Sequence, residues 1–321
     1  MRCELIRIED ADPAGVGDLL AREADEWHRL LHWDREAPRR FHHLLARRHD
    51  LPGWLVLADG EVAGKVLVGA YRRTRTLENP YVMVEQRGRG CLAALLEGVT
   101  AELASDRQVE RVETGFFAFG EEVPEAGLAH HGWRSLPRRY MLRSTASALP
   151  DARAPARAPA RAGVTTGPGR AGGALSGVLH AAYQTAPDRE AVEVYRTRTG
   201  CARYLDALCR GGSCGALAAP LSARAVDGRG HVVGFLLATR IAPSTVHVAQ
   251  IAVRPEWQAQ RLGTALLDRF ADEARRAGAT RATLLVTDAN EHVRAWYGRR
   301  GYRDLAPFHT YWWERSARPV R

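Results

Sequence analysis

The chain has 321 residues, of which 45% are hydrophobic and 26% charged, a composition typical of a folded globular protein. This length suffices for two domains, and no apolar run is long enough to span a bilayer. The formal net charge of +9 favours anionic partners, but no basic run is interleaved with aromatic residues as in nucleic-acid-binding proteins. We therefore expect a cytoplasmic protein that binds neither membranes nor nucleic acid.

The first ten residues and the cysteines agree with this expectation. The opening "MRCELIRIED" carries charges and no apolar core, so we predict no secretory signal. Five cysteines are an odd number, which favours free thiols over a disulfide framework. Three of them, Cys201, Cys209 and Cys214, lie close together but lack the C-x-x-C spacing of zinc sites. We expect no metal.

The first half begins with a helical segment, "EWHRLLHWDREAPRRFHHLLARRHD" (26–50). His28 and His32 are one helical turn apart and could hold a metal, but no third ligand is evident, so a helix that packs on a sheet is the preferred interpretation. The segment "WLVLADGEVAGKVLVGAY" (54–71) predicts two strands around a tight turn at Asp59 and Gly60. A strand, the loop "EQRGRGCLAALL" (85–96) and a helix follow.

An Ala/Pro/Arg-rich segment, 146–164, separates this half from the next. Proline at that density removes backbone donors and favours extended conformations, which predicts a semi-stiff linker. The predicted domains are therefore 1–145 and 165–321.

The second half repeats the plan of the first. The segment "ARAVDGRGHVVGFLLATR" (223–240) predicts a hairpin, and a strand, the loop "EWQAQRLGTALL" (256–267) and a helix follow it. Both halves close with glycine and an aromatic residue, in "HHGWRS" and "RRGYRD". A repeat of this size indicates a duplicated domain.

The loop before the last long helix is a candidate anion site. The first turn of a helix has backbone N–H groups without intrahelical partners, and the helix dipole favours negative charge there. Small residues at Ala259, Gly263, Thr264 and Ala265 would let a phosphate approach the backbone. We expect Gly263 to open the helix with backbone angles closed to other residues. An ordinary turn before a helix is the alternative.

The segment "IAVRPEWQAQRLGTALL" (251–267) resembles the acyl-CoA-binding motif of the GNAT superfamily of N-acetyltransferases. That motif is Gln or Arg, two residues, Gly, one residue, then Gly or Ala. Gln258 takes the first place and Gly263 the last, whereas Arg261 stands at the usual middle glycine and Ala259 replaces another common glycine. An arginine there could pair with phosphate.

A second segment, "LLVTDANEHVRAWYGRRGY" (284–302), is similar to a later motif of the superfamily. That motif is a strand, an asparagine, and a helix that carries tyrosine before a glycine and an aromatic residue. Asn290, Tyr297, Gly301 and Tyr302 occupy these places.

The resemblance implies an α/β (α+β) fold with two GNAT-like domains, each a mixed, mostly antiparallel sheet flanked by helices. It implies a CoA-dependent N-acyltransferase that moves an acetyl or other acyl group from a thioester to a primary amine of a small molecule or peptide. Acetyl-CoA or another acyl-CoA is the expected donor. The cofactor-binding residues that it implies are Ile251, Ala252 and Val253 along the pantetheine arm, Gln258, Ala259, Gln260, Arg261, Leu262, Gly263, Thr264 and Ala265 around the diphosphate, and Asn290 on the arm.

The reaction needs a base for the amine and an acid for the leaving thiolate. The resemblance implies Tyr297 as the acid, with a packing tyrosine as the alternative. For the base we choose His247 on the strand 245–253, where some members of the superfamily carry a catalytic glutamate and where a side chain with a pKa of about 6.5 could accept a proton. A hydrogen-bonded structural histidine is the alternative. Regular alternation puts His247 and Ile251 on one face and Gln250 on the other, barring a bulge.

The first half departs from the motifs. Leu92 stands where Gly263 stands in the second half and is expected to crowd a diphosphate, and Leu128 takes the place of Tyr297. We therefore expect a degenerate first domain and a catalytic second one, a layout that resembles tandem GNAT proteins such as mycothiol synthase.

Several alternatives stay open. One is a longer acyl chain delivered by CoA or by an acyl carrier protein, which would then be a partner, for natural-product or peptide modification. Another is a non-catalytic CoA-binding or interaction protein. Nucleic-acid binding through the arginine-rich linker is disfavoured, and a homodimer is a further alternative.

Overall fold

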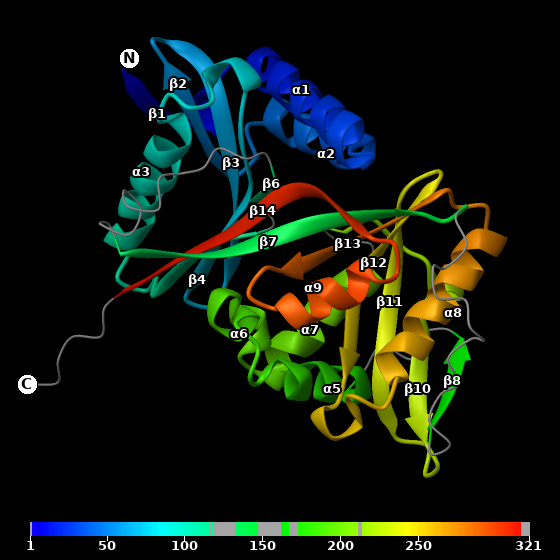
Figure 1. Cartoon of the computed structure of the whole chain (residues 1–321). Helices are drawn as coiled ribbons and strands as arrows, with labels where there is room; N and C mark the ends of the chain where they lie inside the picture. Colours follow the sequence, from blue (N-terminus) through cyan, green and yellow to red (C-terminus); the bar gives the residue numbers. More distant parts are fainter. Residues whose placement is uncertain are drawn as a thin grey trace, which may run out of the picture. The chain divides into compact units, whose positions relative to one another are not determined.

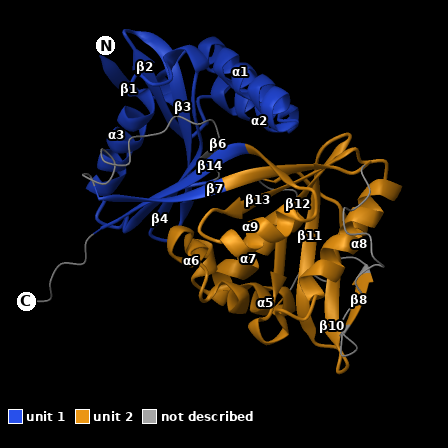
Figure 2. Ribbon diagram, in the orientation of Figure 1, with its two compact units in different colours: residues 1–138, 306–321 blue, residues 139–305 orange. Residues whose placement is uncertain are grey.

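The structure, a computed structural model, describes residues 2–115, 117–118, 132–146, 162–166, 173–210 and 214–315 (Figure 1). The chain divides into two compact units (Figure 2). Unit 1 comprises residues 1–138 and 306–321, and unit 2 comprises residues 139–305. Most of the expected linker, and Leu128, lie outside the described residues, while strand β8 (Ala162–Thr166) includes the last three residues of the linker segment.

Unit 1 is a mixed sheet with helices. Its strand order is β1-β2-β3-β4-β5-β14, and all of these neighbours are antiparallel except β4 and β5. The strands are β1 (Cys3–Arg7), β2 (Gly53–Ala58), β3 (Glu61–Tyr71), β4 (Thr74–Val82), β5 (Arg111–Thr114) and β14 (Arg303–Glu314), with the short β6 (Phe117–Ala118) beside β14; the helices are α1 (Pro13–Leu31), α2 (Glu36–Arg47) and α3 (Cys91–Ser105).

The predicted elements of the first half are confirmed in this unit. β2 and β3 form the expected hairpin, in which Asp59 and Gly60 both have positive φ. The expected helical segment 26–50 is interrupted: α1 ends where His32 adopts a left-handed conformation, and α2 begins at Glu36. Trp27 is buried, as a helix packed on the sheet requires. No group of three metal-ligating side chains occurs anywhere in the described part of the chain.

Unit 2 has the same plan. Its strand order is β7-β13-β12-β11-β10-β8, and β12 and β13 are parallel. The strands are β7 (Trp133–Ser144), β10 (Ala223–Asp227), β11 (Val232–Ala242), β12 (Thr245–Val253) and β13 (Arg281–Thr287), with the short β9 (Ala216–Leu217) beside β11; the helices are α5 (Gly173–Tyr183), α6 (Asp188–Ala191), α7 (Arg198–Cys209), α8 (Leu262–Arg276) and α9 (Glu291–Gly298). The fold class is therefore as predicted.

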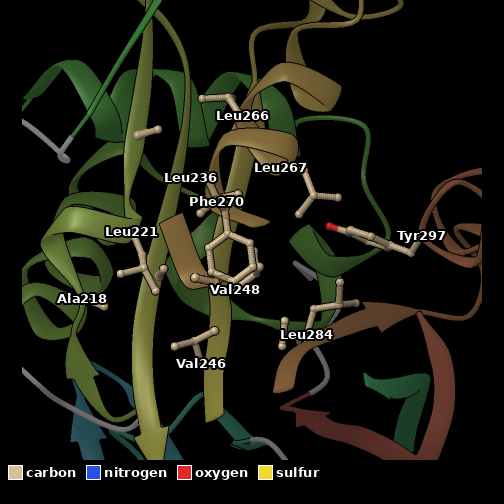
Figure 3. Packing of buried hydrophobic residues seen from close by; sticks show 14 of the residues in the cluster. Ala218, Leu221, Leu236, Val246, Val248, Leu266, Leu267, Phe270, Leu284 and Tyr297 are labelled. Carbon is tan, nitrogen blue, oxygen red and sulfur yellow. The ribbon is translucent and has the colours of Figure 1, made fainter. Parts of the chain in front are cut away.

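Helices cover both faces of the sheet in unit 2. On one face, Leu266 and Phe270 of α8 pack on Val246 and Val248 of β12, and Tyr297 of α9 joins this core (Figure 3). On the other face, α5 packs against β11 and β12 and is itself covered by α7. Among the described helices, none combines the length and apolarity needed to cross a membrane.

The compact units and the predicted domains differ at two short segments. Residues 139–145, assigned by the sequence repeat to the first domain, group with unit 2, and residues 306–321, assigned to the second, group with unit 1. In unit 1, Trp312 of β14 pairs with Glu113 of β5, and Tyr311 lies in the hydrophobic core. The repeat marks where each sequence unit begins, but pairing between distant strands decides which unit the last strand completes.

Candidate active site

A bulge in β12 determines which of its side chains share a face. The pairing with β11 shifts between Val248 and Gln250, which leaves Ala249 as the extra residue. Val246, Val248 and Ile251 all pack in the core beneath α8. His247 and Gln250 therefore both lie on the opposite face, where Gln250 contacts Tyr183 of α5. The expectation from regular alternation, which separated these two residues and grouped Ile251 with His247, was wrong because it assumed no bulge.

The same bulge coincides with an opening between the two parallel strands. The register of β12 with β13 runs only from Thr245 to Val248, whereas β12 continues to Val253 and β13 to Thr287. Beyond the bulge, the backbone of Ile251, Ala252 and Val253 pairs with β11 on one side. Its other edge faces the opening, and an extended ligand can pair with that edge as a strand would.

An exposed loop connects β12 to α8. A short 3-10 turn, Pro255–Trp257, is followed by Gln258, Ala259, Gln260 and Arg261, all exposed. The Gln258 side chain returns to the end of β12, where its Nε2 donates to the carbonyl of Val253 over 3.0 Å. Ala259 and Arg261 have φ of 58° and 62°, in the left-handed region that favours glycine.

Helix α8 begins one residue earlier than expected, at Leu262. Leu262 and Ala265 are buried, so they offer a ligand only their backbone, whereas Gly263 and Thr264 are partly exposed. Gly263 is not among the residues with positive φ, so the expectation that it opens the helix with special backbone angles was wrong. Ala259 and Arg261 carry that conformation instead. The smallness of Gly263 still leaves the first turn accessible, and a Cβ there would lie 4.0 Å from Trp296.

A cation lies beside this first turn, which the sequence reasoning missed. Arg300 donates to the hydroxyl of Thr264 over 3.0 Å, and its guanidinium lies 4.7 Å from the centroid of the Trp296 ring. Asp268 lies 3.8 Å from the same guanidinium and partly balances its charge. The i, i+4 spacing of Trp296 and Arg300 was the signal that could have linked them. Positive charge and unpaired helix N–H groups favour a diphosphate at this place.

Tyr297 is almost fully buried, with 4% of its surface exposed, and its ring packs on those of Trp296 and Tyr302. Burial, followed by the nearby Tyr302 and Tyr183, raises the pKa of the Tyr297 phenol well above its usual range. The phenol therefore keeps its proton at neutral pH. This is the state that a proton donor requires and that a base cannot use.

His247 is buried beside β13. Its Nδ1 lies 2.9 Å from the hydroxyl of Thr283, and its ring stacks on Tyr140 at a centroid distance of 6.0 Å. Burial lowers the pKa of His247 to about 3. The imidazole is then neutral at pH 7 but holds an added proton only weakly, which favours the structural interpretation over the catalytic base. The assignment as base stays a prediction.

Asn290 precedes α9 and is partly exposed. Its backbone N–H donates to the carbonyl of Thr287 at the end of β13, over 3.0 Å, and its side chain does not cap the helix. Asn290 thus follows the end of β13, beyond the point where β13 stops pairing with β12. The other predicted cofactor residues lie at the end of β12, in the loop that follows it and in the first turn of α8.

Gln250 is the second feature that the sequence reasoning missed. It is buried and contacts the hydroxyls of three tyrosines: Tyr183 of α5, Tyr195 of the 3-10 turn Glu193–Tyr195, and Tyr204 of α7. The spacing of the apolar residues of β12 was the available signal: Val246 and Val248 are two residues apart, as are Ile251 and Val253, but Val248 and Ile251 are three apart, which indicates an extra residue between them.

The corresponding loop of unit 1 has the same backbone. Gly88 and Gly90 have φ of 71° and 81° before α3. Leu92 is buried in the core of unit 1 with Leu95, so the expectation that it crowds a diphosphate was wrong. The counterpart of Gln258 is Arg87, which donates to the Val82 carbonyl over 3.0 Å and to both oxygens of Glu26 over 2.7 and 2.6 Å.

Comparison with known proteins identifies this arrangement. Residues 186–302 match the profile of the Acetyltransferase (GNAT) family. A GCN5-related N-acetyltransferase from Sphaerobacter thermophilus has a similar fold, with a TM-score of 0.65 at 18% identity, over 97% of this chain and 95% of that one. A tandem GNAT protein from the clavulanic acid biosynthesis pathway gives a TM-score of 0.58 at 17% identity, over 98% of each chain. No curated protein sequence gave a significant match.

The two structural similarities cover nearly the whole chain, so the fold of both units is that of tandem GNAT proteins. This fold supports transfer of an acyl group from acyl-CoA. The family profile covers α6 to α9, which include the opening, the loop and Tyr297. Residues 186–302 are therefore similar in sequence to the Acetyltransferase (GNAT) family.

Proposed function

We propose that unit 2 is an N-acyltransferase, which moves an acetyl or other acyl group from acyl-CoA to a primary amine of a small molecule or peptide. The observation that carries this proposal is the end of β12–β13 pairing at Val248, beyond which β12 continues to the exposed loop and the first turn of α8, together with the buried and protonated Tyr297. Unit 1 is proposed to be non-catalytic.

The residues present fit acyl-CoA. The exposed loop Gln258–Arg261 and the first turn of α8 offer backbone N–H groups, with Arg261 and Arg300 nearby to balance the diphosphate charge. The free edge of Ile251, Ala252 and Val253 and the amide of Asn290 flank the opening where the pantetheine arm would lie. Bound acyl-CoA would supply the thioester at which the amine reacts.

In this proposal the amine attacks directly, and Tyr297 holds a proton on its Oη for the sulfur that leaves. His247 is kept as the candidate base, although its low pKa makes a structural role the stronger alternative. If His247 is structural, the amine binds in its neutral form or loses its proton to solvent.

Binding of acetyl-CoA to the full chain, followed by native mass spectrometry, tests the cofactor site. We expect one molecule per chain. Gly263→Glu should abolish binding, because it places a negative charge on the first turn of α8, where the nearest atoms of Trp296 leave room for the new side chain. Gly263→Gln controls for size, and Ala277→Glu adds the same charge at the exposed far end of α8.

Release of free thiol in the presence of primary amines then tests catalysis. Binding without transfer to any amine would favour a non-catalytic CoA-binding protein. Two acetyl-CoA molecules per chain would contradict the expectation of a single cofactor site and show that unit 1 also binds acetyl-CoA. No binding would remove acyl-CoA as the donor and direct the test to acyl carrier proteins.

A further inference from the structure

Gln250 stands at the point where β12 leaves β13. It is the first residue after the bulge, its partner on β11 is Leu237, and 5% of its surface is exposed. A buried amide needs partners for two N–H bonds and one carbonyl oxygen, and an amide placed there without them would destabilise the fold. The hydrogen-bond partners of the Gln250 amide therefore determine whether it is stable in this buried position.

The contacts of Gln250 fix the orientation of its amide. Its Nε2 donates to the hydroxyl oxygen of Tyr183 over 2.9 Å and lies 3.4 Å from the backbone carbonyl of Ile251. A backbone carbonyl can only accept, so the group facing it is the N–H end. The carbonyl oxygen of the amide then accepts from the hydroxyls of Tyr195 and Tyr204, over 3.4 and 3.3 Å.

This orientation dictates how Tyr183 can interact. Because its oxygen accepts from Gln250, its own O–H must be directed away from that amide group. The ring is held in place by Tyr195, whose centroid is 4.2 Å away and which is itself buried and packed edge-on against Tyr204. Tyr183 is the last residue of α5 and remains partly exposed. The hydroxyl of Tyr183, at the exposed side of the group formed by Gln250 and the three tyrosines, thus has a fixed direction.

Tyr183 is hydrogen-bonded to Gln250, which lies where the pairing of β12 with β13 has ended, and it contributes to the raised pKa of Tyr297. The two phenols come from opposite faces of the sheet, one from α5 and one from α9. They can approach each other only where the strands between them part, because closed pairing would fill that space with backbone. The acyl group and the amine must meet at this same opening.

We propose that Gln250 is a positioning residue, which holds the Tyr183 phenol at the opening between β12 and β13, and that this phenol contacts the acceptor amine. The inference rests on the proposed function and adds the residue on the amine side of the reaction. The occupant is a primary amine on an apolar or aromatic skeleton, because the partly exposed rings beside Gln250 are those of Tyr183 and Tyr204, and tyrosine rings attract both flat apolar groups and ammonium cations.

Gln250→Glu is the sharpest test. A carboxylate keeps the acceptors for Tyr195 and Tyr204 but loses the N–H group, so Tyr183 must turn its own proton towards residue 250. The KM for the amine should rise about tenfold, the effect of one hydrogen bond, and the Kd for acetyl-CoA should stay within about twofold. Tyr183→Phe should raise KM by a similar factor, and the double variant no further, since both remove one contact.

Gln184→Glu is the matched control. It introduces the same charge one residue from Tyr183, at an exposed side chain whose bond is to the carbonyl of His180. It should leave KM within about twofold, which is the change expected from an exposed charge. Additive effects of Gln250→Glu and Tyr183→Phe, an unchanged KM, or an equal loss of acetyl-CoA affinity would show a merely structural role and overturn the proposal.

A second readout separates this inference from the proposed function. In protein labelled with 3-fluorotyrosine, the fluorine resonance of Tyr183, assigned by its loss in Tyr183→Phe, should shift on addition of millimolar benzylamine or hexylamine. A shift without acyl transfer would sink the proposed function and leave the amine contact standing. Absence of a shift with both amines would overturn the contact, whether or not transfer occurs.

Discussion

Ala259 and Gly88 hold the same left-handed backbone conformation at equivalent places in the two loops, with φ of 58° and 71°. Arg261 and Gly90 repeat this relationship directly before α8 and α3. In unit 1 this conformation is adopted by glycine, which tolerates it, whereas in unit 2 it is adopted by alanine and arginine, in which it is strained. Strain of this kind persists where the surrounding structure imposes it, and it is common at ligand-binding loops.

The two loops should therefore respond oppositely to substitution. Gly90→Ala should destabilise unit 1 by about 1–2 kcal/mol, because a Cβ disfavours the left-handed region, although no atom lies within 4 Å of that position to clash with it. Arg261→Gly should be neutral or stabilise unit 2 by roughly 0.5 kcal/mol, since relief of strain is partly offset by the flexibility of glycine. Hydrogen exchange of α3 and α8 reads the two units separately. Equal losses in both would contradict the prediction.

Tyr297→Phe tests the proton donor. The pKa of Tyr297 is raised, so the alkaline limb that it gives to a pH–rate profile should lie above the pKa of about 10 of an ordinary tyrosine. The variant should lower kcat by about 100-fold, the smaller end of the range for general acid catalysis, and leave the Kd for acetyl-CoA nearly unchanged. Tyr302→Phe, in the same core, is the control for packing. An unchanged kcat would remove Tyr297 from the mechanism.

The low pKa of His247 has a consequence for stability. In the unfolded chain the imidazole has a pKa of about 6.5, and in the fold it has a pKa of about 3. Between these values the unfolded state binds the proton and the folded state does not. The stabilising contribution is thus complete above about pH 6.5, and the free energy of unfolding falls by about 1.4 kcal/mol per pH unit as the pH drops towards 3.

His247→Gln should remove that slope and keep a hydrogen-bonding group near Thr283. Urea unfolding of unit 2 between pH 4 and pH 7 measures the difference between the variant and the natural chain. The same variant decides between the two interpretations of His247. If the residue is the base, the variant loses most activity at low pH, where few amines are neutral; if it is structural, the pH profile of kcat/KM keeps its shape.

The sequence was sufficient for the motifs but not for the bulge or the loop conformation. Hairpins, the helix after each loop and Tyr297 on its helix follow from local residue patterns. The grouping of His247 with Gln250 depends on one extra residue, Ala249, which regular alternation conceals. Positive φ at Arg261 contradicts its intrinsic preference, and only the glycine at the equivalent place of the first half, Gly90, signals it.

The last strand, β14, gives a prediction about unit 1, although the sequence repeat assigns this strand to the second domain. In unit 1, β14 pairs with β5 and contributes three buried aromatic residues, Phe308, Tyr311 and Trp312. Deletion of residues 306–321 should therefore unfold or loosen unit 1, at a cost on the order of 5 kcal/mol from lost aromatic burial. The deleted residues are distant from β5 in sequence, yet the loss should appear in the exchange rates of β5 and α3 before it appears in α8.

A chain that ends at residue 315 is the matched control, because it keeps all of β14. Its unit 1 should exchange as slowly as that of the full chain. If the deletion of 306–321 instead raised exchange only in α8 and β12, the last strand would belong to unit 2, as the predicted limit of 165–321 has it. Hydrogen exchange followed by mass spectrometry distinguishes these results peptide by peptide, since β5 and α8 lie in separate parts of the chain.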